Sequence, residues 1–485
     1  MPENTPEYVS YHGQNRLLII GRETDLDRVL ARVDGTFRLF WLADSSNSIS
    51  KAGVETLKRD DDTRLSGFLG QFQLNHYPDL LFDQVLDFQQ PPSIDCSVPP
   101  FGYHAITDNH SLDTAIAGLV DMIGDFDKIK YFKLDSNLCA HQQNGITGCQ
   151  RCIEVCATDA ISSVNGQISV NPWLCQGCGD CSSVCPSGAI SYRHPDLETT
   201  LQSLKTALTD HSGPVLFYSG ETPEDLPADI LPFQLEALGV LNLAIAMNAI
   251  AYGTDRVLIR DEKLTPESQQ VLVALIDEAN TLLSAMGFGE RLMSWNTQNP
   301  LPALEPLTIP PARYQPEADK RRAIRMATDH LNQYSNPPAS VCDLPQTAGF
   351  GRIDVRQSAC TLCMACVSVC PAQALQSGSE RPQLKFIEAN CLQCRLCENA
   401  CPEQAIKLIP RYQFDSALAR QTELLYEEKP FLCINCQKPF ASECMINAIL
   451  QKLQHHPMFQ GQRKQQLLLC EDCKIAAHFN DTRHD

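Results

Sequence analysis

The sequence predicts an α+β multidomain protein. Two cysteine-rich modules are interleaved with small α/β domains, and a C-terminal cysteine-rich metal module follows them. Two observations favour this class. The chain has 23 cysteines among 485 residues, most of them regularly spaced, and the stretches between them alternate strand-like and helix-like apolar patterns. At about 150 residues per domain, the length favours roughly three domains.

Composition narrows the class of function. The formal net charge of −19 argues against a protein that coats nucleic acid or anionic lipid. The first residues carry neither a basic nor an apolar leader pattern. The most apolar stretch, 237–250, is too short for a transmembrane segment and contains Asn242 and Asn248. We therefore expect a cytoplasmic protein whose cysteines are reduced and hold metal.

Sixteen cysteines form two pairs of quartets. The first pair comprises Cys139, Cys149, Cys152 and Cys156, then Cys175, Cys178, Cys181 and Cys185. The second pair comprises Cys360, Cys363, Cys366 and Cys370, then Cys391, Cys394, Cys397 and Cys401. Three of the four quartets follow C-x2-C-x2-C-x3-C-P, with Pro186, Pro371 and Pro402 closing them. Because the whole pair recurs downstream, the sequence contains an internal repeat.

This spacing has a chemical reason. Three thiolates two residues apart wrap one iron–sulfur cubane, and the fourth cysteine ligates the other cluster of the pair. The rule predicts four ligand sets: Cys139, Cys149 and Cys152 with Cys185; Cys175, Cys178 and Cys181 with Cys156; Cys360, Cys363 and Cys366 with Cys401; Cys391, Cys394 and Cys397 with Cys370. Structural zinc, the alternative, rarely shows three tandem cysteines with a fourth before proline.

Each quartet pair resembles the bacterial two-cluster ferredoxin over about 65 residues. The resemblance implies short β-hairpins, two small helices and two [4Fe–4S] clusters per module, about four in all. An Asn165-Gly166 pair between two apolar runs predicts a tight hairpin there.

The first quartet departs from the pattern. Nine residues separate Cys139 from Cys149, and Ala157 stands where proline is usual. Cys139 either reaches the iron across this loop or leaves a three-iron or labile site. His141, in the same loop, is a candidate replacement ligand, but we expect it to be a surface histidine.

A second metal site is predicted near the C-terminus. Its two C-x2-C pairs comprise Cys433, Cys436, Cys470 and Cys473. Their separation favours structural zinc, with a fifth iron–sulfur cluster or unmetallated thiols as alternatives. A helix is expected over 445–456. Cys444 is either a spare ligand or a buried apolar residue, and Cys96 and Cys342 are expected in cores.

The predicted domains are an N-terminal α/β domain (1–130), a dicluster module (131–200), an α/β domain (201–300), a Pro-rich linker with a helix (301–350), a second dicluster module (351–415) and the four-cysteine module (416–485). In the N-terminal domain we expect strands at 16–21 and 37–42 and a helix at 26–33. The turn after Gly21 lacks the G-x-G-x-x-G of a dinucleotide site.

In the middle domain, parallel strands are expected at 214–218 and 256–259, and helices at 235–251 and 265–286. The pattern around Pro232-Phe233, Leu238-Gly239 and Gly253-x-Asp255 resembles the δ-type subunit of hydrogenase complexes, without that family's cysteines. The linker helix carries Lys320-Arg321-Arg322 and Arg325, which form the main basic cluster of the chain. We expect a solvated helix, with a docking site for an acidic partner as the alternative.

The order of motifs resembles the large multi-cluster ferredoxin proteins encoded beside molybdenum formate dehydrogenases. The matching stretches include Cys436-Gln-Lys-Pro-Phe440 and Leu469-Cys-Glu-Asp-Cys473. The resemblance implies an electron carrier whose redox partner is such a dehydrogenase, with an accessory or maturation factor as the alternative. No catalytic motif is recognisable, so we expect no catalytic residues and no nucleic-acid partner.

Overall fold

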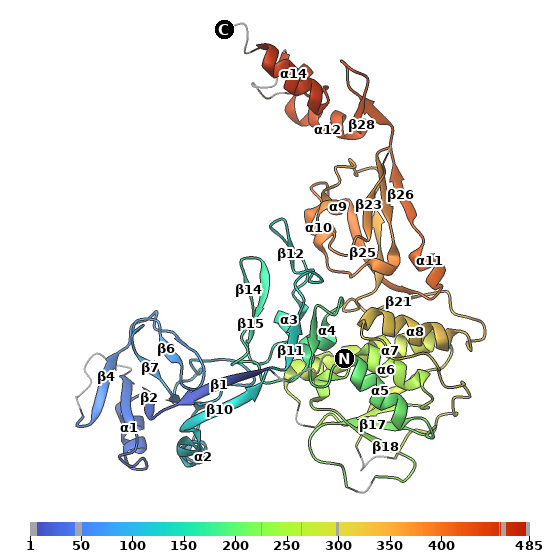
Figure 1. The fold of residues 1–485 in the computed structure, drawn as a ribbon. Coiled ribbons are helices and arrows are strands. Elements are labelled where there is room, and N and C mark those ends of the chain that lie inside the picture. The colour runs from blue at the N-terminus through green and yellow to red at the C-terminus, as the bar shows by residue number, and fades with distance from the viewer. Residues whose placement is uncertain are drawn as a thin grey trace.

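The computed structural model describes residues 7–43, 51–224, 226–262, 264–296, 300–379, 381–454, 456 and 462–481. Along the chain, an N-terminal α/β domain is followed by the first cysteine-rich domain, a middle α/β domain, the second cysteine-rich domain and a small C-terminal module (Figure 1). Within the described parts of the chain, every helix is too short or too polar to span a bilayer.

The N-terminal domain is built on a parallel five-stranded sheet. Its strands, in spatial order, are β4 (Val54–Lys58), β3 (Arg38–Ala43), β2 (Arg16–Gly21), β8 (Gln84–Asp87) and β9 (Tyr103–Ala105). Helices α1 (Glu23–Leu30) and α2 (Asn109–Leu119) cover one face. The antiparallel strands β5 (Leu65–Ser66), β6 (Phe72–Leu74) and β7 (Leu81–Phe82) cover the other. Both predicted strands are confirmed, and the predicted helix begins earlier, at Glu23.

A two-stranded ribbon joins this domain to the first cysteine-rich domain. Strand β1 (Tyr8–Gly13) pairs antiparallel with β10 (Gly124–Ile129), which follows the short 3-10 helix η1 (Val120–Met122). From β10, Lys128 Nζ donates to the carbonyl oxygens of Trp173 at 2.9 Å and Cys175 at 2.7 Å. The ribbon is thereby fixed to a cysteine loop.

The middle domain is a parallel sheet covered by helices. The strand order is β18 (Leu231–Gln234), β17 (Val215–Tyr218), β19 (Val257–Ile259) and β20 (Leu292–Ser294). Around it lie α5 (Leu197–Ala207), η2 (Leu238–Val240), α6 (Leu243–Ala251) and α7 (Pro266–Ala285). The parallel pairing of β17 and β19 is confirmed. The predicted helix over 235–251 begins later, because the Asn242 side chain caps α6 by accepting from two of its N–H groups.

Helix α8 (Lys320–Asn332) belongs to this domain's core. Ala323, Ile324, Ala327 and Leu331 are buried in one apolar cluster with α6 and α7. The expectation that this helix is solvated is wrong. An apolar stripe at helical spacing, on a helix that is basic elsewhere, directs one face to the core.

The two cysteine-rich domains share one plan. In the first, β11 (Phe132–Leu134) pairs with β16 (Ile190–Tyr192), and β14 (Ile161–Val164) forms a hairpin with β15 (Gln167–Val170); the helices are α3 (Arg151–Glu154) and α4 (Asp180–Val184). In the second, β22 (Gly351–Val355) pairs with β25 (Ile406–Gln413), and β23 (Leu375–Ser377) with β24 (Gln383–Phe386); the helices are α9 (Ala365–Ser368), η3 (Glu388–Asn390) and α10 (Leu396–Ala400). The predicted Asn-Gly hairpin is confirmed, with φ of 51° at Asn165 and 78° at Gly166.

Additional elements flank the second domain. Strand β21 (Val341–Asp343) extends the β25 pairing, and β26 (Glu423–Glu427) extends β24; α11 (Ser416–Arg420) lies between β25 and β26. The C-terminal module contains the hairpin β27 (Pro430–Leu432) and β28 (Pro439–Ser442), then α12 (Glu443–Leu453), α13 (Gln462–Gln466) and α14 (Glu471–Asp481). Helix α12 falls largely within the predicted helical stretch.

Candidate metal centres

Left-handed backbone residues shape the three tandem cysteine loops in the same way. In each loop, positive φ occurs at the second residue after the first cysteine and at the residue after the second cysteine. The pairs are Gly177 and Gly179, Leu362 and Met364, and Gln393 and Arg395. Turns of this kind form concave backbone nests in which N–H groups face a bound anionic group. The repeated motif therefore forms the same cradle three times.

The cysteines of the first domain gather into two crossed sets. Burial raises the pKa of Cys139, Cys149 and Cys152, and the charge of Cys185 raises each further. Burial likewise raises the pKa of Cys175, Cys178 and Cys181, and here Cys156 adds to the rise. Because such repulsion weakens with distance, each triplet lies near the fourth cysteine of the other quartet. The cysteine spacing groups the same residues, and the ligand sets themselves stay a prediction.

The surroundings of these thiols fit an iron–sulfur cluster. One pocket is lined by Cys156, Cys175, Cys178 and Cys181 together with apolar residues that include Phe132 and Ile161. Four soft sulfur donors in an apolar cradle suit iron–sulfur ligation.

The nine-residue separation in the first quartet is closed by a hairpin. Strands β12 (Gln142–Gln143) and β13 (Ile146–Thr147) pair antiparallel. At the hairpin base, the Cys149 N–H donates to the Ala140 carbonyl at 3.0 Å, which brings Cys139 back beside Cys149. The loop adds residues without moving Cys139 away from its predicted set.

The expectation that His141 is a surface histidine is wrong. Its side chain is buried, with Nδ1 2.9 Å from the Cys149 carbonyl oxygen and Nε2 2.8 Å from Ser163 Oγ. Both ring nitrogens are thus occupied by hydrogen bonds. The residue braces the inserted hairpin against β14, and neither nitrogen faces a metal site.

The second domain repeats the crossed arrangement. Burial raises the pKa of Cys360 and Cys366, and Cys401 acts on both. Burial also raises the pKa of Cys391, Cys394 and Cys397, with Cys370 adding to all three. Cys363 is the exposed member of the sixteen.

The two domains touch where the Cys139 set of the first domain meets the Cys391 set of the second. Ala140, Val369, Leu392 and Leu396 form one buried cluster, against which Cys149 and Cys394 both pack. Polar contacts cross the same boundary: Asn399 Nδ2 donates to the Thr147 carbonyl at 2.8 Å, and Arg151 Nη2 to the Ala348 carbonyl at 2.9 Å. The contact therefore combines an apolar centre with hydrogen bonds at its edge.

Two cations at the start of α8 join the domains. Lys320 Nζ donates to the carbonyl oxygens of Ser182 at 2.8 Å and Cys185 at 3.0 Å. The adjacent Arg321 donates to the carbonyls of Pro186 and Gly349 through Nη1 and of Ala389 and Cys391 through Nη2, at 2.8–3.2 Å. These six main-chain acceptors, which come from both domains, are thus held by two neighbouring residues.

The predicted C-terminal site is brought together. The sulfur atoms of Cys433, Cys436, Cys470 and Cys473 lie within 4.8 Å of one another. Sulfurs around one tetrahedral ion at a Zn–S distance of about 2.3 Å are about 3.8 Å apart, and Cys436 and Cys470 are 3.6 Å apart. Burial acts to raise the pKa of Cys433, but backbone N–H groups outweigh it and lower the pKa to about 6. The group fits a single metal ion bound by thiolates.

Comparisons with known proteins agree with these geometries. The sequence pattern of the 4Fe-4S dicluster domain matches residues 147–189 and 359–405. A ferredoxin 7Fe of Hydrogenibacillus schlegelii is 44% identical over 41 residues, 8% of this chain and 53% of the relative. The chain contains two 4Fe-4S dicluster domains. It has a mixed α/β architecture, and it spans about half the length of the curated relative it matches.

Some features of these sites were not predicted from the sequence. The first dicluster match begins after Cys139, so the inserted hairpin lies largely outside the family pattern. The sequence showed the basic run of α8, but nothing in its spacing indicated that Lys320 and Arg321 contact cysteine loops. Cys444 lies outside the C-terminal group, with Sγ 3.8 Å from the Cys360 carbonyl oxygen.

Proposed function

We propose that the chain relays electrons along one path through both dicluster domains, between a dehydrogenase and an acceptor protein. The observation that carries the proposal is the shared apolar cluster of Cys149 and Cys394, one cysteine from each domain. Without such contact, two dicluster domains on one chain would be independent carriers. With this contact, the Cys139 set and the Cys391 set share one packed apolar cluster.

The order of the sets along the path follows from their neighbours. Burial is the main cause that raises the pKa of Cys181 and of Cys397. The charge of Cys152 adds to the rise at Cys181, and the charge of Cys366 adds to the rise at Cys397, so the two sets of each domain are neighbours. The order is then the Cys175 set, the Cys139 set, the Cys391 set and the Cys360 set. Each set would hold a [4Fe–4S] cluster, which supplies one-electron chemistry when bound. Because Cys363 is exposed, the Cys360 end offers a partner the closest approach among the sixteen cysteines.

The partner we propose is a cytoplasmic molybdenum formate dehydrogenase or an enzyme of similar electron chemistry. Support comes from the resemblance in motif order and from the net charge of −19, which suits docking against a basic surface. Rates of such docking fall as salt screens the charges.

Metal analysis and spectroscopy test the path. An anaerobically purified sample should contain about 16 iron and about 16 sulfide, four of each per cluster. On full reduction, electron paramagnetic resonance should show magnetic coupling between clusters of different domains. Coupling confined to pairs within each domain would contradict a single path.

The kinetics of reoxidation of the reduced protein distinguish a single electron path from two independent carriers. A reduced sample mixed with less than one equivalent of an acceptor protein should lose electrons from both domains in one phase. Two phases, with one domain left reduced, would contradict the proposal. Candidate dehydrogenases are then mixed with the oxidised protein, and rapid reduction of the clusters is expected from the physiological donor.

For the C-terminal site we propose one structural zinc ion. The four-thiol group and its short sulfur separations support one tetrahedral ion, and zinc is the common ion in such sites. Metal analysis should find about one zinc per chain, and Cys436→Ser should remove it without changing the iron content. A zinc-free protein with about 17 iron would instead indicate a single iron at this site.

A further inference from the structure

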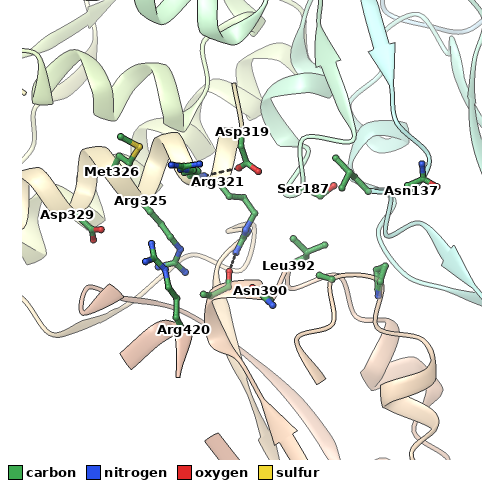
Figure 2. A pocket seen from close by; sticks show the side chains of 15 residues that line it. Asn137, Ser187, Asp319, Arg321, Arg325, Met326, Asp329, Asn390, Leu392 and Arg420 are labelled. Carbon is green, nitrogen blue, oxygen red and sulfur yellow. Dashed lines mark hydrogen bonds between the residues drawn. The ribbon is translucent and has the colours of Figure 1, made fainter. Parts of the chain in front are cut away.

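An arginine-rich groove lies where α8 meets both dicluster domains. It has a volume of about 710 Å³, within the range of small-molecule sites. Figure 2 shows its side chains: Arg321, Arg325 and Asp329 come from α8, Arg420 from α11, and Asn390 and Leu392 from the loop around Cys391. None of these residues belongs to the proposed ligand sets.

Arg325 is the central group of this groove. The residue is 8% exposed, and its guanidinium lies 5.4 Å from the ring centroids of both Phe350 and Tyr412. In the described part of the chain, no acceptor lies within hydrogen-bond distance of its Nη1 atom. A buried guanidinium N–H without an acceptor is costly, and an oxygen of a ligand would satisfy it.

The charge of the groove is positive. Four guanidiniums, including that of Arg322, line it together with the two carboxylates of Asp319 and Asp329. Both carboxylates are engaged within the fold. Asp319 accepts from the Arg322 N–H at 2.9 Å, and Asp329 accepts from Ser416 Oγ at 2.7 Å. Arg322 is also paired with Glu317 at 3.0 Å, whereas Figure 2 shows the guanidiniums of Arg325 and Arg420 beside each other in the groove.

Part of the lining is less polar. It comprises Leu138, Pro371, Ala372 and Leu392, together with Asn390. A ligand that fills the groove would thus have an anionic end and a less polar body. A bare inorganic ion would leave most of the 710 Å³ empty.

We propose that this groove binds a small organic anion through a carboxylate or phosphate group held by Arg325 and Arg420. Guanidinium forks pair with the oxygens of either group in two-pronged geometry. Bound there, the anion would touch α8, α11 and the loop that follows η3 at the same time. It would therefore tie the middle domain to the second dicluster domain, whether or not the electron path is continuous.

Isothermal titration calorimetry on the anaerobic holoprotein tests the site. The probes are inorganic pyrophosphate and citrate, at constant ionic strength set with chloride, so that screening does not change. Saturable binding of one or both is expected, with one site per chain. Stronger binding of pyrophosphate would identify a phosphate-bearing ligand, and stronger binding of citrate a carboxylate ligand.

Two variants locate the binding. Arg420→Met, on an exposed side chain, should weaken binding about tenfold or more, since a charge-assisted pair is lost. Arg325→Met should abolish it, and circular dichroism checks that this variant folds. Arg381→Met is the matched control, because Arg381 is exposed and outside the groove. No saturable binding of either probe, or equal binding by wild type and Arg420→Met, would overturn the proposal.

Discussion

One of the differences between the two dicluster domains makes the contact between them. Both fold around cysteine loops with left-handed turns three residues after the fourth cysteine, at Asp159, Gly188, Gln373 and Gln404. Only the first carries an insertion within a quartet, the β12–β13 hairpin. This hairpin contributes Ile146 and Thr147 to the boundary with α10. The departure from the common motif is thus a docking element.

We propose that the fourth ligand is exchanged between the two clusters of each domain, and replacing that cysteine should have the largest effect of the substitutions considered. Cys370→Ser should lose the cluster of Cys391, Cys394 and Cys397, so that iron falls from about 16 to about 12 per chain. Cys156→Ser should do the same to the Cys175 set. Iron analysis and electron paramagnetic resonance of the remaining clusters measure the result.

The matched control is Cys96→Ser, because Cys96 donates to the Val98 carbonyl oxygen at 3.4 Å and belongs to no proposed set. It should retain about 16 iron. Loss of the Cys360 cluster from Cys370→Ser would show that the ligands are not exchanged.

The two cations of α8 contact the two domains to different extents, and Lys320→Met should test this difference. Lys320 holds carbonyls of the first domain only, whereas Arg321 spans both. Removing the ammonium leaves several part-buried carbonyls without a donor, and we expect the first domain to lose about 2–4 kcal/mol of stability. Denaturant unfolding followed by loss of cluster absorbance measures it.

Lys452→Met is the corresponding control on the surface. Its ammonium pairs with Glu403 at 2.9 Å and is largely exposed, so a change of about 0–1 kcal/mol is expected. Equal effects of the two substitutions would mean that Lys320 does not hold the cysteine loop.

The inserted hairpin meets the second domain closely at Gly148, and a methyl group there should separate the two domains. A Cβ atom would lie 2.5 Å from Leu396 Cγ and 2.9 Å from the Cys394 carbonyl oxygen. Gly148→Ala should therefore cost about 1–3 kcal/mol and weaken magnetic coupling between the domains. In Gly118→Ala, on α2, the methyl group meets open space, and stability should rise slightly. Unchanged coupling in Gly148→Ala would contradict contact through this hairpin.

The elements that could be predicted from the sequence are those set by residues close together in the chain. The cysteine spacing, the Asn165-Gly166 turn and the strand at 16–21 each follow from residues that are adjacent or at fixed short intervals. The place of α8 could not be predicted in this way. Its basic residues contact carbonyl oxygens more than a hundred residues earlier in the chain, at Cys185, and a carbonyl has no sequence signature.

His141 shows the same limit within one loop. A histidine beside Asn144-Gly145 has the sequence context of a surface turn, yet its ring is buried because β14 lies across it. The pairing of this loop with a strand twenty residues later depends on the fold of the whole domain. The sequence therefore indicated the cysteines that the fold brings together, but not the residues that position them.

The smallest expected effect concerns the hydrogen bond between His141 and Ser163, which holds the inserted hairpin of the first domain against β14. Ser163→Ala removes the partner of His141 Nε2 and leaves a buried ring nitrogen unpaired. We expect a loss of about 0.5–1.5 kcal/mol, confined to the first domain, and faster loss of iron from the Cys139 set in a chelator. Ser162→Ala, one residue earlier on the same strand with its side chain exposed, should leave both quantities unchanged. If Ser163→Ala also leaves them unchanged, the hairpin is held by its backbone pairing and by contact with α10, and the Gly148 substitution becomes the more direct measure of what the insertion contributes.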